Sequence, residues 1–331
     1  MAKQRSSLTI DDVVGAWAIL PTPAKAGASD WRAEDTVDID ETVRIVEELI
    51  ASGVNGILSL GTFGECATLL PEEKSAFLGA VIEAVRGRVP FFTGSTALST
   101  RQVVRDTRMA HDMGADGTML GVPMWCAPSE DMVVQYYKDV AEACPEMAIC
   151  VYANPEAFKF EFGRSFWRRV SDIDQVITAK YVSVGNILTD MALSRQRIRF
   201  MPLDGFYINC ARIAPDFFKA FWTGGAICGP EVVIKLRDDV AEAVRTGDWS
   251  AAERLSGRID ASYGPLFPNG SFRDFSTYNI ILEKERMNAA GWAHVGPARA
   301  PYHIAPEAYL ENARLSGRMW AELCAEIREA K

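Results

Sequence analysis

The sequence lacks several features that mark large classes of proteins. Its seven cysteines are scattered over 331 residues and are never spaced C-x-x-C, which argues against structural zinc and against a disulfide framework. No stretch approaches about eighteen uninterrupted apolar residues, and the segment Met1 to Ile10 lacks the apolar run of a secretory signal. We therefore expect a cytoplasmic protein with reduced thiols and no membrane partner.

A surplus of positive charge is also missing. The chain has 35 lysines and arginines against 44 acidic residues, for a formal net charge of -9. Nucleic acids and anionic lipids attract clusters of basic residues, so neither is expected as a partner. A small anionic substrate stays possible, because a few backbone N–H groups or one cation can bind it locally.

Nucleotide-binding loops are absent as well, since no G-x-G-x-x-G follows the first apolar run and no G-x-x-x-x-G-K-[ST] occurs. Short apolar runs alternate with amphipathic stretches, which is typical of parallel strands joined by helices. Eight runs are predicted as strands: Gly15–Leu20, Gly56–Leu60, Val89–Gly94, Gly117–Leu120, Ala148–Tyr152, Val176–Lys180, Ile198–Leu203 and Gly225–Cys228. The helices predicted between them are Asp40–Ala51, Pro71–Val85, Thr100–Met113, Ser129–Ala143, Arg164–Val170 and Ala214–Phe221.

This order predicts an α/β protein with a (β/α)8 TIM barrel at residues 1–230. A doubly wound open sheet gives a similar string, and the absence of a nucleotide loop favours the barrel. Residues 231–331 are predicted to form a C-terminal helical extension packed on the barrel, within a single catalytic unit. Its predicted helices are Val232–Thr246, Asp248–Ser262, Phe275–Ala290 and Pro306–Ala330, with Gly291–His303 as an ordered loop.

Lys180 is the first candidate catalytic residue, because it ends an apolar strand and TIM barrels carry their active sites at the carboxyl ends of strands. Apolar neighbours disfavour the ammonium form of a lysine and thereby supply the neutral amine that attacks a carbonyl group. The alternative is a lysine whose head reaches solvent from the strand end.

Two further segments follow strands. In Gly61-Thr62-Phe63-Gly-Glu, consecutive backbone N–H groups and the Thr62 hydroxyl are suited to hold a carboxylate, although the segment taken alone is more typical of a purely structural turn. In Tyr152-Ala-Asn154-Pro, the tyrosine ends a strand, and a phenol beside an imine-forming lysine can transfer protons. The alternative is a buried tyrosine bonded to a carbonyl. The three histidines do not end strands and receive no catalytic role.

Together these segments resemble the pyruvate-dependent class I aldolases of the dihydrodipicolinate synthase and N-acetylneuraminate lyase superfamily, over roughly residues 12–265. The resemblance implies a (β/α)8 barrel, a homotetramer and a Schiff base on Lys180, with no metal and no organic cofactor. It also implies Tyr152 as the proton-transferring phenol and the Thr62–Phe63 turn as the holder of the substrate carboxylate.

The chain departs from the synthases of this superfamily at several positions. Phe63 replaces a hydroxyl residue, Pro123-Met-Trp125 stands where the synthases place a tyrosine that crosses a subunit interface, and the arginine after Y-x-x-P is missing. Lysine biosynthesis is therefore disfavoured. The replacements include several aromatic residues, which suit a flat aromatic acceptor or, alternatively, pack in the core or an interface: Trp125, Phe158, Phe160, Phe221 and Trp222.

Longer segments resemble the hydratase-aldolases of aromatic hydrocarbon catabolism, such as naphthalene degradation: G-T-F-G-E-C-A-T-L, M-L-G-V-P-M-W, Y-A-N-P-E-A-F-K-F, T-A-K-Y and F-S-T-Y-N-I. This implies cleavage of an arylidene pyruvate of the o-hydroxybenzylidene type to a salicylaldehyde-type aldehyde and pyruvate. Asn154 and Asn279 are expected to position the hydrating water, and Trp222 to contact substrate. An ortho-carboxyl substrate, another pyruvate-dependent lyase of the superfamily and a non-catalytic keto-acid binding protein are the alternatives.

Overall fold

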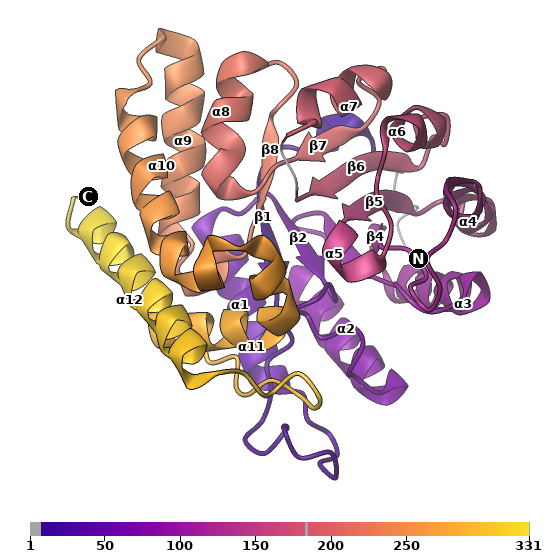
Figure 1. Ribbon diagram of the computed structural model, residues 1–331, viewed down its shortest axis with the longest axis horizontal. Helices are drawn as coiled ribbons and strands as arrows, with labels where there is room; N and C mark the ends of the chain where they lie inside the picture. The colour runs from indigo at the N-terminus through magenta and orange to yellow at the C-terminus, as the bar shows by residue number, and fades with distance from the viewer. Residues whose placement is uncertain (1–7, 183–184, 331) are drawn as a thin grey trace.

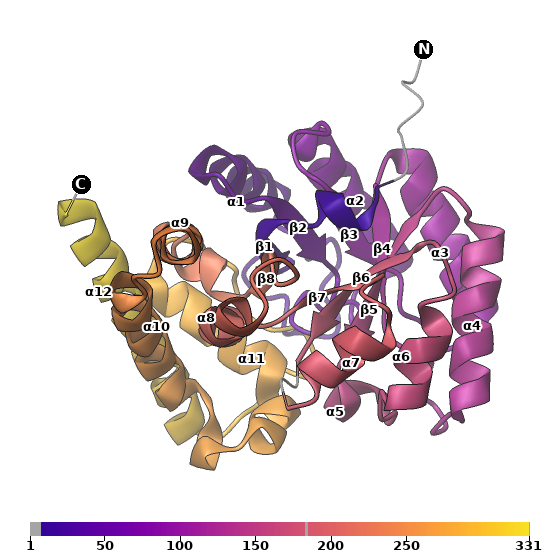
Figure 2. The same ribbon diagram turned by 90° about the horizontal axis from the view of Figure 1, so that it is seen from above.

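The computed structural model describes residues 8–182 and 185–330, and these form a barrel of parallel strands ringed by helices (Figure 1; Figure 2). The strands follow the order β7-β6-β5-β4-β3-β2-β1-β8, and a parallel bridge between Leu203 and Trp222 brings the two ends together. The strands are β1 (Gly15–Leu20), β2 (Gly56–Ser59), β3 (Phe91–Gly94), β4 (Gly117–Leu120), β5 (Ala148–Ala153), β6 (Val176–Tyr181), β7 (Arg199–Met201) and β8 (Ala220–Thr223). The predicted TIM barrel is confirmed.

Most of the barrel helices lie where the apolar periodicity predicts them. Ser99 and Ser129 cap the starts of two of them with their hydroxyl groups, and Gly53 ends the first helix in the left-handed conformation. The barrel helices are α1 (Ile39–Ser52), α2 (Pro71–Val85), α3 (Thr100–Met113), α4 (Glu130–Ala143), α5 (Pro155–Phe158), α6 (Arg164–Val170), α7 (Ile187–Leu193) and α8 (Asp204–Ile213), and the one-turn η1 (Ile10–Asp12) precedes β1.

The last strand was predicted in the wrong place. The segment Gly225–Cys228 is a 3-10 helix, η2, and the predicted helix Ala214–Phe221 runs into the true strand β8, while α8 precedes it. Gly225–Cys228 resembles a strand in sequence because it is buried on all sides: a Cβ on Gly225 would stand only 2.1 Å from the Trp320 ring. In a short, fully buried apolar run, the sequence pattern does not distinguish a strand from a helix.

The C-terminal extension is helical, as predicted, and its bounds differ from the prediction by a few residues. It comprises α9 (Glu231–Thr246), α10 (Ser250–Tyr263), η3 (Gly264–Leu266), η4 (Pro268–Gly270), α11 (Phe272–Ala290) and α12 (Glu307–Glu329). Helix α11 packs against α12 and reaches α5 at the end of the barrel where the strands finish (Figure 1; Figure 2). No helix in the described ranges is long and apolar enough to cross a membrane.

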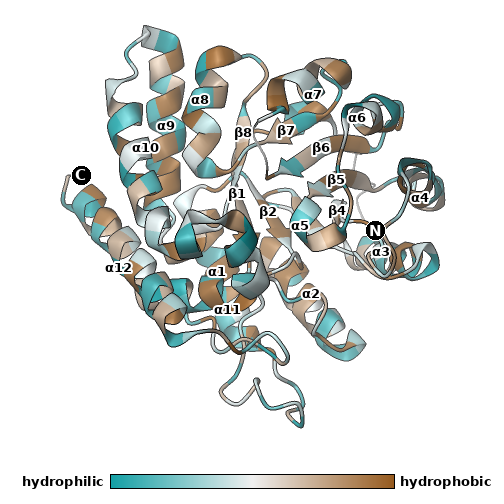
Figure 3. Cartoon of the chain, in the orientation of Figure 1, coloured by the Kyte–Doolittle hydropathy of each residue, from teal (hydrophilic) through white to brown (hydrophobic). Residues whose placement is uncertain are grey.

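The barrel interior is apolar and aromatic, and Figure 3 shows brown, hydrophobic strands surrounded by helices that alternate between brown and teal. Trp17 and Phe92 meet edge to face across the interior, with ring centroids 5.4 Å apart. At the carboxyl ends of the strands, Tyr152 of β5 is the register partner of Lys180 of β6, so the strand pairing alone sets these two side chains beside each other.

Candidate active site

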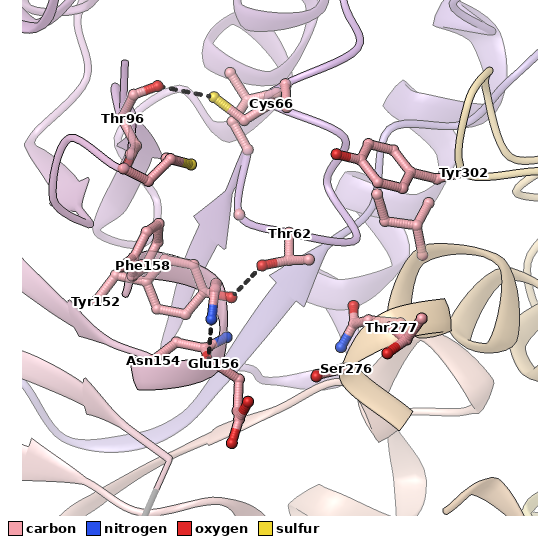
Figure 4. A pocket seen from close by; sticks show the side chains of 17 residues that line it. Thr62, Cys66, Thr96, Tyr152, Asn154, Glu156, Phe158, Ser276, Thr277 and Tyr302 are labelled. Atoms are coloured by element: carbon pink, nitrogen blue, oxygen red, sulfur yellow. Dashed lines mark hydrogen bonds between the residues drawn. The ribbon is translucent and has the colours of Figure 1, made fainter. Parts of the chain in front are cut away.

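A cavity of about 230 Å³ lies at the carboxyl end of the barrel, between the strands and α11. Figure 4 shows its walls coming from the turn after β2 through Thr62, from the end of β5 through Tyr152 and Asn154, and from α11 through Ser276 and Thr277. Gly61 and Asn279 line it as well. These segments are far apart in the sequence. The barrel and the extension therefore build the cavity jointly.

Lys180 is buried, with 4% of its surface exposed, so it does not reach solvent from the strand end. Its Nζ lies 3.6 Å from the ring centroid of Trp222 and 4.5 Å from that of Tyr152. Trp222 is held in this position because its indole N–H donates to the Tyr181 carbonyl at 3.0 Å. Lys180 is not itself a lining residue of the cavity, and it lies against the Tyr152 ring that is.

Burial lowers the pKa of the Lys180 ammonium, and the ionised forms of Tyr152, Cys150 and Glu283 oppose that shift only in part. The amine is consequently neutral more often than an exposed lysine, which is the form that attacks a carbonyl carbon. The ring faces on either side favour a cation once one forms. The site therefore accepts both a nucleophilic amine and the cationic nitrogen that follows from it.

Tyr152 is the phenol closest to this lysine. Its hydroxyl lies 2.9 Å from the Thr62 hydroxyl, within hydrogen-bond distance, and its ring meets Phe158 edge to face with centroids 5.1 Å apart. Burial acts to raise the pKa of the Tyr152 phenol, but the positive charge of Lys180 and hydrogen bonds from Thr62 and Asn154 outweigh it, so that the pKa is lowered. The phenol is thus poised to give and take protons beside the lysine.

The turn after β2 is compact and presents hydrogen-bond donors beside the Tyr152 phenol. Cys66 N donates to the Gly61 carbonyl, and the Thr22 hydroxyl donates to the Gly64 carbonyl at 2.8 Å. The Thr62 backbone N–H faces the Tyr152 hydroxyl, to which the Thr62 hydroxyl is also paired. The backbone N–H groups of Thr62 and Phe63 and the Thr62 hydroxyl, at one turn, form a suitable site for a carboxylate.

A buried charge network holds this turn, and it was not foreseen from the sequence. Glu65 is fully buried and accepts from the Arg299 backbone N–H at 2.7 Å, from the Arg299 guanidinium and from Lys284 Nζ at 2.6 Å. Arg299 also donates to the Thr36 hydroxyl. Because the partners of Glu65 lie in α11 and in the loop after it, the network fixes the turn to the extension. A local motif does not reveal partners 234 residues away.

The two asparagines differ in their environment. Asn154 is buried, and its side-chain oxygen accepts the Ala157 N–H at 3.3 Å, which caps α5. Asn279 lines the cavity, and its side-chain oxygen is buried without a hydrogen-bond partner in the part of the chain that the structure describes. A buried oxygen of this kind is suited to accept a hydrogen bond from a molecule in the cavity. Ser276, Thr277 and Tyr302 also line the cavity and were not predicted.

The predicted aromatic residues separate into different environments. Phe158 forms part of the cavity wall. Trp125 does not line it: 79% of its surface is exposed, on the loop between β4 and α4. Phe160 packs among other phenylalanines, and Phe221 is fully buried against Tyr207, so both are core residues. Phe63 is buried beside Gly224.

Comparison with known proteins relates this arrangement to a family. The model of the dihydrodipicolinate synthetase family matches residues 25–314. The chain is 60% identical to the trans-O-hydroxybenzylidenepyruvate hydratase-aldolase of Sphingobium xenophagum, over 96% of this chain and 97% of that one. It is 37% identical to the trans-2'-carboxybenzalpyruvate hydratase-aldolase of Nocardioides sp. (strain KP7), over 95% of each chain. Its fold superimposes on the solved structure described as PhdJ bound to substrate intermediate with a TM-score of 0.94, at 36% identity, covering 97% of this chain and 99% of that one. The chain belongs to the dihydrodipicolinate synthetase family.

Proposed function

We propose that this chain is a Schiff-base hydratase-aldolase, a carbon–carbon lyase that cleaves an arylidene pyruvate of the trans-o-hydroxybenzylidenepyruvate type with water. The products are pyruvate and an aromatic aldehyde of the salicylaldehyde type. The observation that carries the proposal is the buried amine of Lys180, 4% exposed, between Trp222 and a phenol that is paired with Thr62. The 60% identity to a hydratase-aldolase over nearly the whole chain supports the same activity.

The reaction begins at the keto group. The neutral amine of Lys180 attacks the keto carbon, and the resulting carbinolamine loses water to leave an iminium conjugated with the alkene. The backbone N–H groups of Thr62 and Phe63 and the Thr62 hydroxyl hold the substrate carboxylate beside the lysine. Tyr152 returns the proton that the departing hydroxyl needs, since its phenol is next to the nitrogen.

Hydration and cleavage then use the iminium as an electron sink. Water adds to the carbon that bears the ring, while electrons move towards the nitrogen and the neighbouring carbon gains a proton. The unpartnered oxygen of Asn279 is suited to orient that water. Tyr152 next removes the proton of the new hydroxyl, the carbon–carbon bond breaks, and the aldehyde leaves. The enamine that stays on Lys180 is protonated and hydrolysed to pyruvate.

The charge of the cavity wall favours an ortho-hydroxyl over an ortho-carboxyl substituent on the ring. Among the described lining residues, Glu156 alone carries a full charge, and it is negative. A second carboxylate on the substrate would meet no cation there, whereas a hydroxyl finds neutral partners in Ser276, Thr277 and Asn279. The same argument makes the carboxybenzalpyruvate type the alternative substrate.

Assembly and cofactor use follow from the same proposal. The lysine imine supplies the electron sink, so the reaction needs neither a metal nor an organic cofactor, and no cluster of metal-ligating side chains occurs in the described ranges. The exposed Trp125 suits a subunit interface, and we propose a cytoplasmic homotetramer whose barrel and extension form a single catalytic unit.

Reductive trapping tests the function directly. Borohydride added with pyruvate should attach a reduced pyruvyl group to Lys180, detected by mass spectrometry of the peptide, and Lys180→Met should abolish it. A keto-acid binding protein without catalysis would bind pyruvate and gain no adduct.

Turnover separates the remaining alternatives. Aldehyde release should be faster with the o-hydroxybenzylidene than with the 2'-carboxybenzal substrate. Aldehyde release from neither compound, or condensation of pyruvate with aspartate semialdehyde, would contradict the assignment.

A further inference from the structure

Helix α11 carries a buried acid near Lys180, Glu283, that has no role in the proposed mechanism. It is 7% exposed. A Cβ placed on Gly224, directly after β8, would stand 3.7 Å from Glu283 Oε1 and 3.5 Å from the tip of the Phe63 ring. The carboxylate therefore lies where β8 ends and behind the turn that carries Thr62. Trp222, two residues before Gly224, contacts Lys180.

The only cation paired with Glu283 in the described ranges is Arg286, and the pairing is loose. One guanidinium nitrogen lies 3.4 Å from the carboxylate, while Nε and the other terminal nitrogen have no hydrogen-bond partner in those ranges. The rings of Tyr263 and Trp320 hold the guanidinium instead, at 4.2 and 5.0 Å from its carbon. Arg286 therefore favours the ionised form of Glu283 but neutralises its negative charge only in part.

Few charged groups act on Lys180 and Glu283 within the described residues. Tyr152 and Cys150 of β5 and Glu283 of α11 act on Lys180, so Glu283 is the only carboxylate among them within the described residues. Burial raises the pKa of Glu283, and Arg286 and Lys180 offset that rise only in part. The charges of Cys228, Tyr263 and Asp204 act on Arg286 as well as that of Glu283.

We propose that Glu283 is the counter-ion of the iminium that forms on Lys180. This inference rests on the proposed function, because it concerns the same imine. The amine attacks in its neutral form, whereas the imine nitrogen that results is cationic at the buried Lys180 position. A fixed negative charge stabilises the cation and leaves the neutral amine unaffected, so it favours every iminium state over the free enzyme. Glu283 acts through the lysine nitrogen and is a positioning residue in this sense. The Tyr152 phenol is then free to move protons instead of balancing charge.

The test is reductive trapping of pyruvate in Glu283→Gln. We expect the pyruvate concentration for half-maximal trapping to rise roughly tenfold. This is the size of effect expected of a unit charge that is near the lysine nitrogen without contacting it, in an effective dielectric of about 20. The acid limb of the trapping rate should move to lower pH, because the carboxylate no longer raises the pKa of the amine. Glu283→Asp keeps the charge and should stay within about threefold of the wild-type value.

Asp204→Asn is the matched control. Asp204 is fully buried and also faces Arg286, but it does not act on Lys180, so this variant loses a buried charge of the same cluster and should trap pyruvate like the wild type. If Glu283→Gln does not fold, Glu283→Leu combined with Arg286→Met replaces the ion pair with apolar groups, a change that proteins often tolerate. The double variant should show the same roughly tenfold rise.

Each outcome decides the proposal. The proposal is wrong if a folded Glu283 variant without the charge keeps the wild-type pyruvate concentration for half-maximal trapping and the wild-type acid limb. It is also wrong if Asp204→Asn raises that concentration as much as the Glu283 variant does. A wild-type protein that forms no adduct would instead contradict the proposed function itself. The two failures are therefore distinguishable by the wild-type measurement alone.

Discussion

Replacing Tyr152 with phenylalanine separates the role of the hydroxyl group from that of the ring that carries it. The substitution removes the hydroxyl that lies 2.9 Å from Thr62 Oγ1. It keeps the ring face 4.5 Å from Lys180 Nζ and the edge-to-face contact with Phe158 at 5.1 Å. One partly buried hydrogen bond is lost, so the free energy of unfolding should fall by only about 0.5–1.5 kcal/mol.

The effect on catalysis should be much larger than the effect on stability. Without the phenol, the proton transfers at the carbinolamine and at the β-hydroxyl depend on water. Removing a positioned acid–base group costs roughly 10²–10⁴ in rate, or about 3–5.5 kcal/mol of activation free energy. Lys180 stays buried, and burial still lowers its pKa, so borohydride should still trap pyruvate on it, more slowly. The assay is aldehyde release from trans-o-hydroxybenzylidenepyruvate under saturating substrate, beside trapping of pyruvate.

Thr62→Val is the matched control, because it breaks the same hydrogen bond from the other side and leaves the phenol in place. We expect a decrease of roughly tenfold in kcat/KM, from the lost donor to the substrate carboxylate and the less well oriented phenol. The reasoning would fail if Tyr152→Phe kept more than about a tenth of the wild-type kcat, or if Thr62→Val were equally slow.

Three further predictions concern charges around the site. Glu65→Gln leaves Lys284 and Arg299 as buried cations without their carboxylate, so urea denaturation should show a loss of about 3–5 kcal/mol, and wild-type stability would contradict the network. Glu156→Lys places a cation on the cavity wall and should shift the kcat/KM ratio roughly tenfold towards the 2'-carboxybenzal substrate; an unchanged ratio would show that wall charge does not select the substituent. Burial lowers the pKa of Lys284 to about 8, so between that pH and its ordinary value of 10.5 the unfolded chain binds more protons. The free energy of unfolding should therefore rise with pH across this window, and Lys284→Met, measured by the same denaturation, should remove the rise.

The sequence predicts the catalytic pair because both residues end strands with clear apolar patterns. In a parallel barrel the carboxyl ends of strands meet at one end, so a lysine ending β6 and a tyrosine ending β5 must be neighbours. The register pairing of Tyr152 with Lys180 confirms that neighbourhood. Local pattern and fold topology suffice here, because neither position depends on a distant segment.

Other parts of the site depend on contacts that local patterns do not encode. Gly225–Cys228 is apolar because α12 covers it, and this burial imitates a strand in the sequence. The fully buried Glu65 needs cations, but Lys284 and Arg299 reach it from the extension and look like ordinary basic residues of a helix and a loop. The exposure of Trp125 likewise depends on how its loop leaves the barrel.

Helix α11 shows why the extension belongs to the site. Asn279 and Glu283 are four residues apart, one helical turn, so Asn279 lines the cavity while Glu283 lies beside Gly224. Lys284, the next residue, points to Glu65 and Thr22. One helix thus provides a wall of the cavity, a buried negative charge and, through Lys284, an ion pair that holds the turn after β2. Under the roles proposed above, substitution of Asn279 should change water addition, substitution of Glu283 the imine equilibrium, and substitution of Lys284 only stability. A helix that merely covered the barrel would change only stability when substituted at any of them.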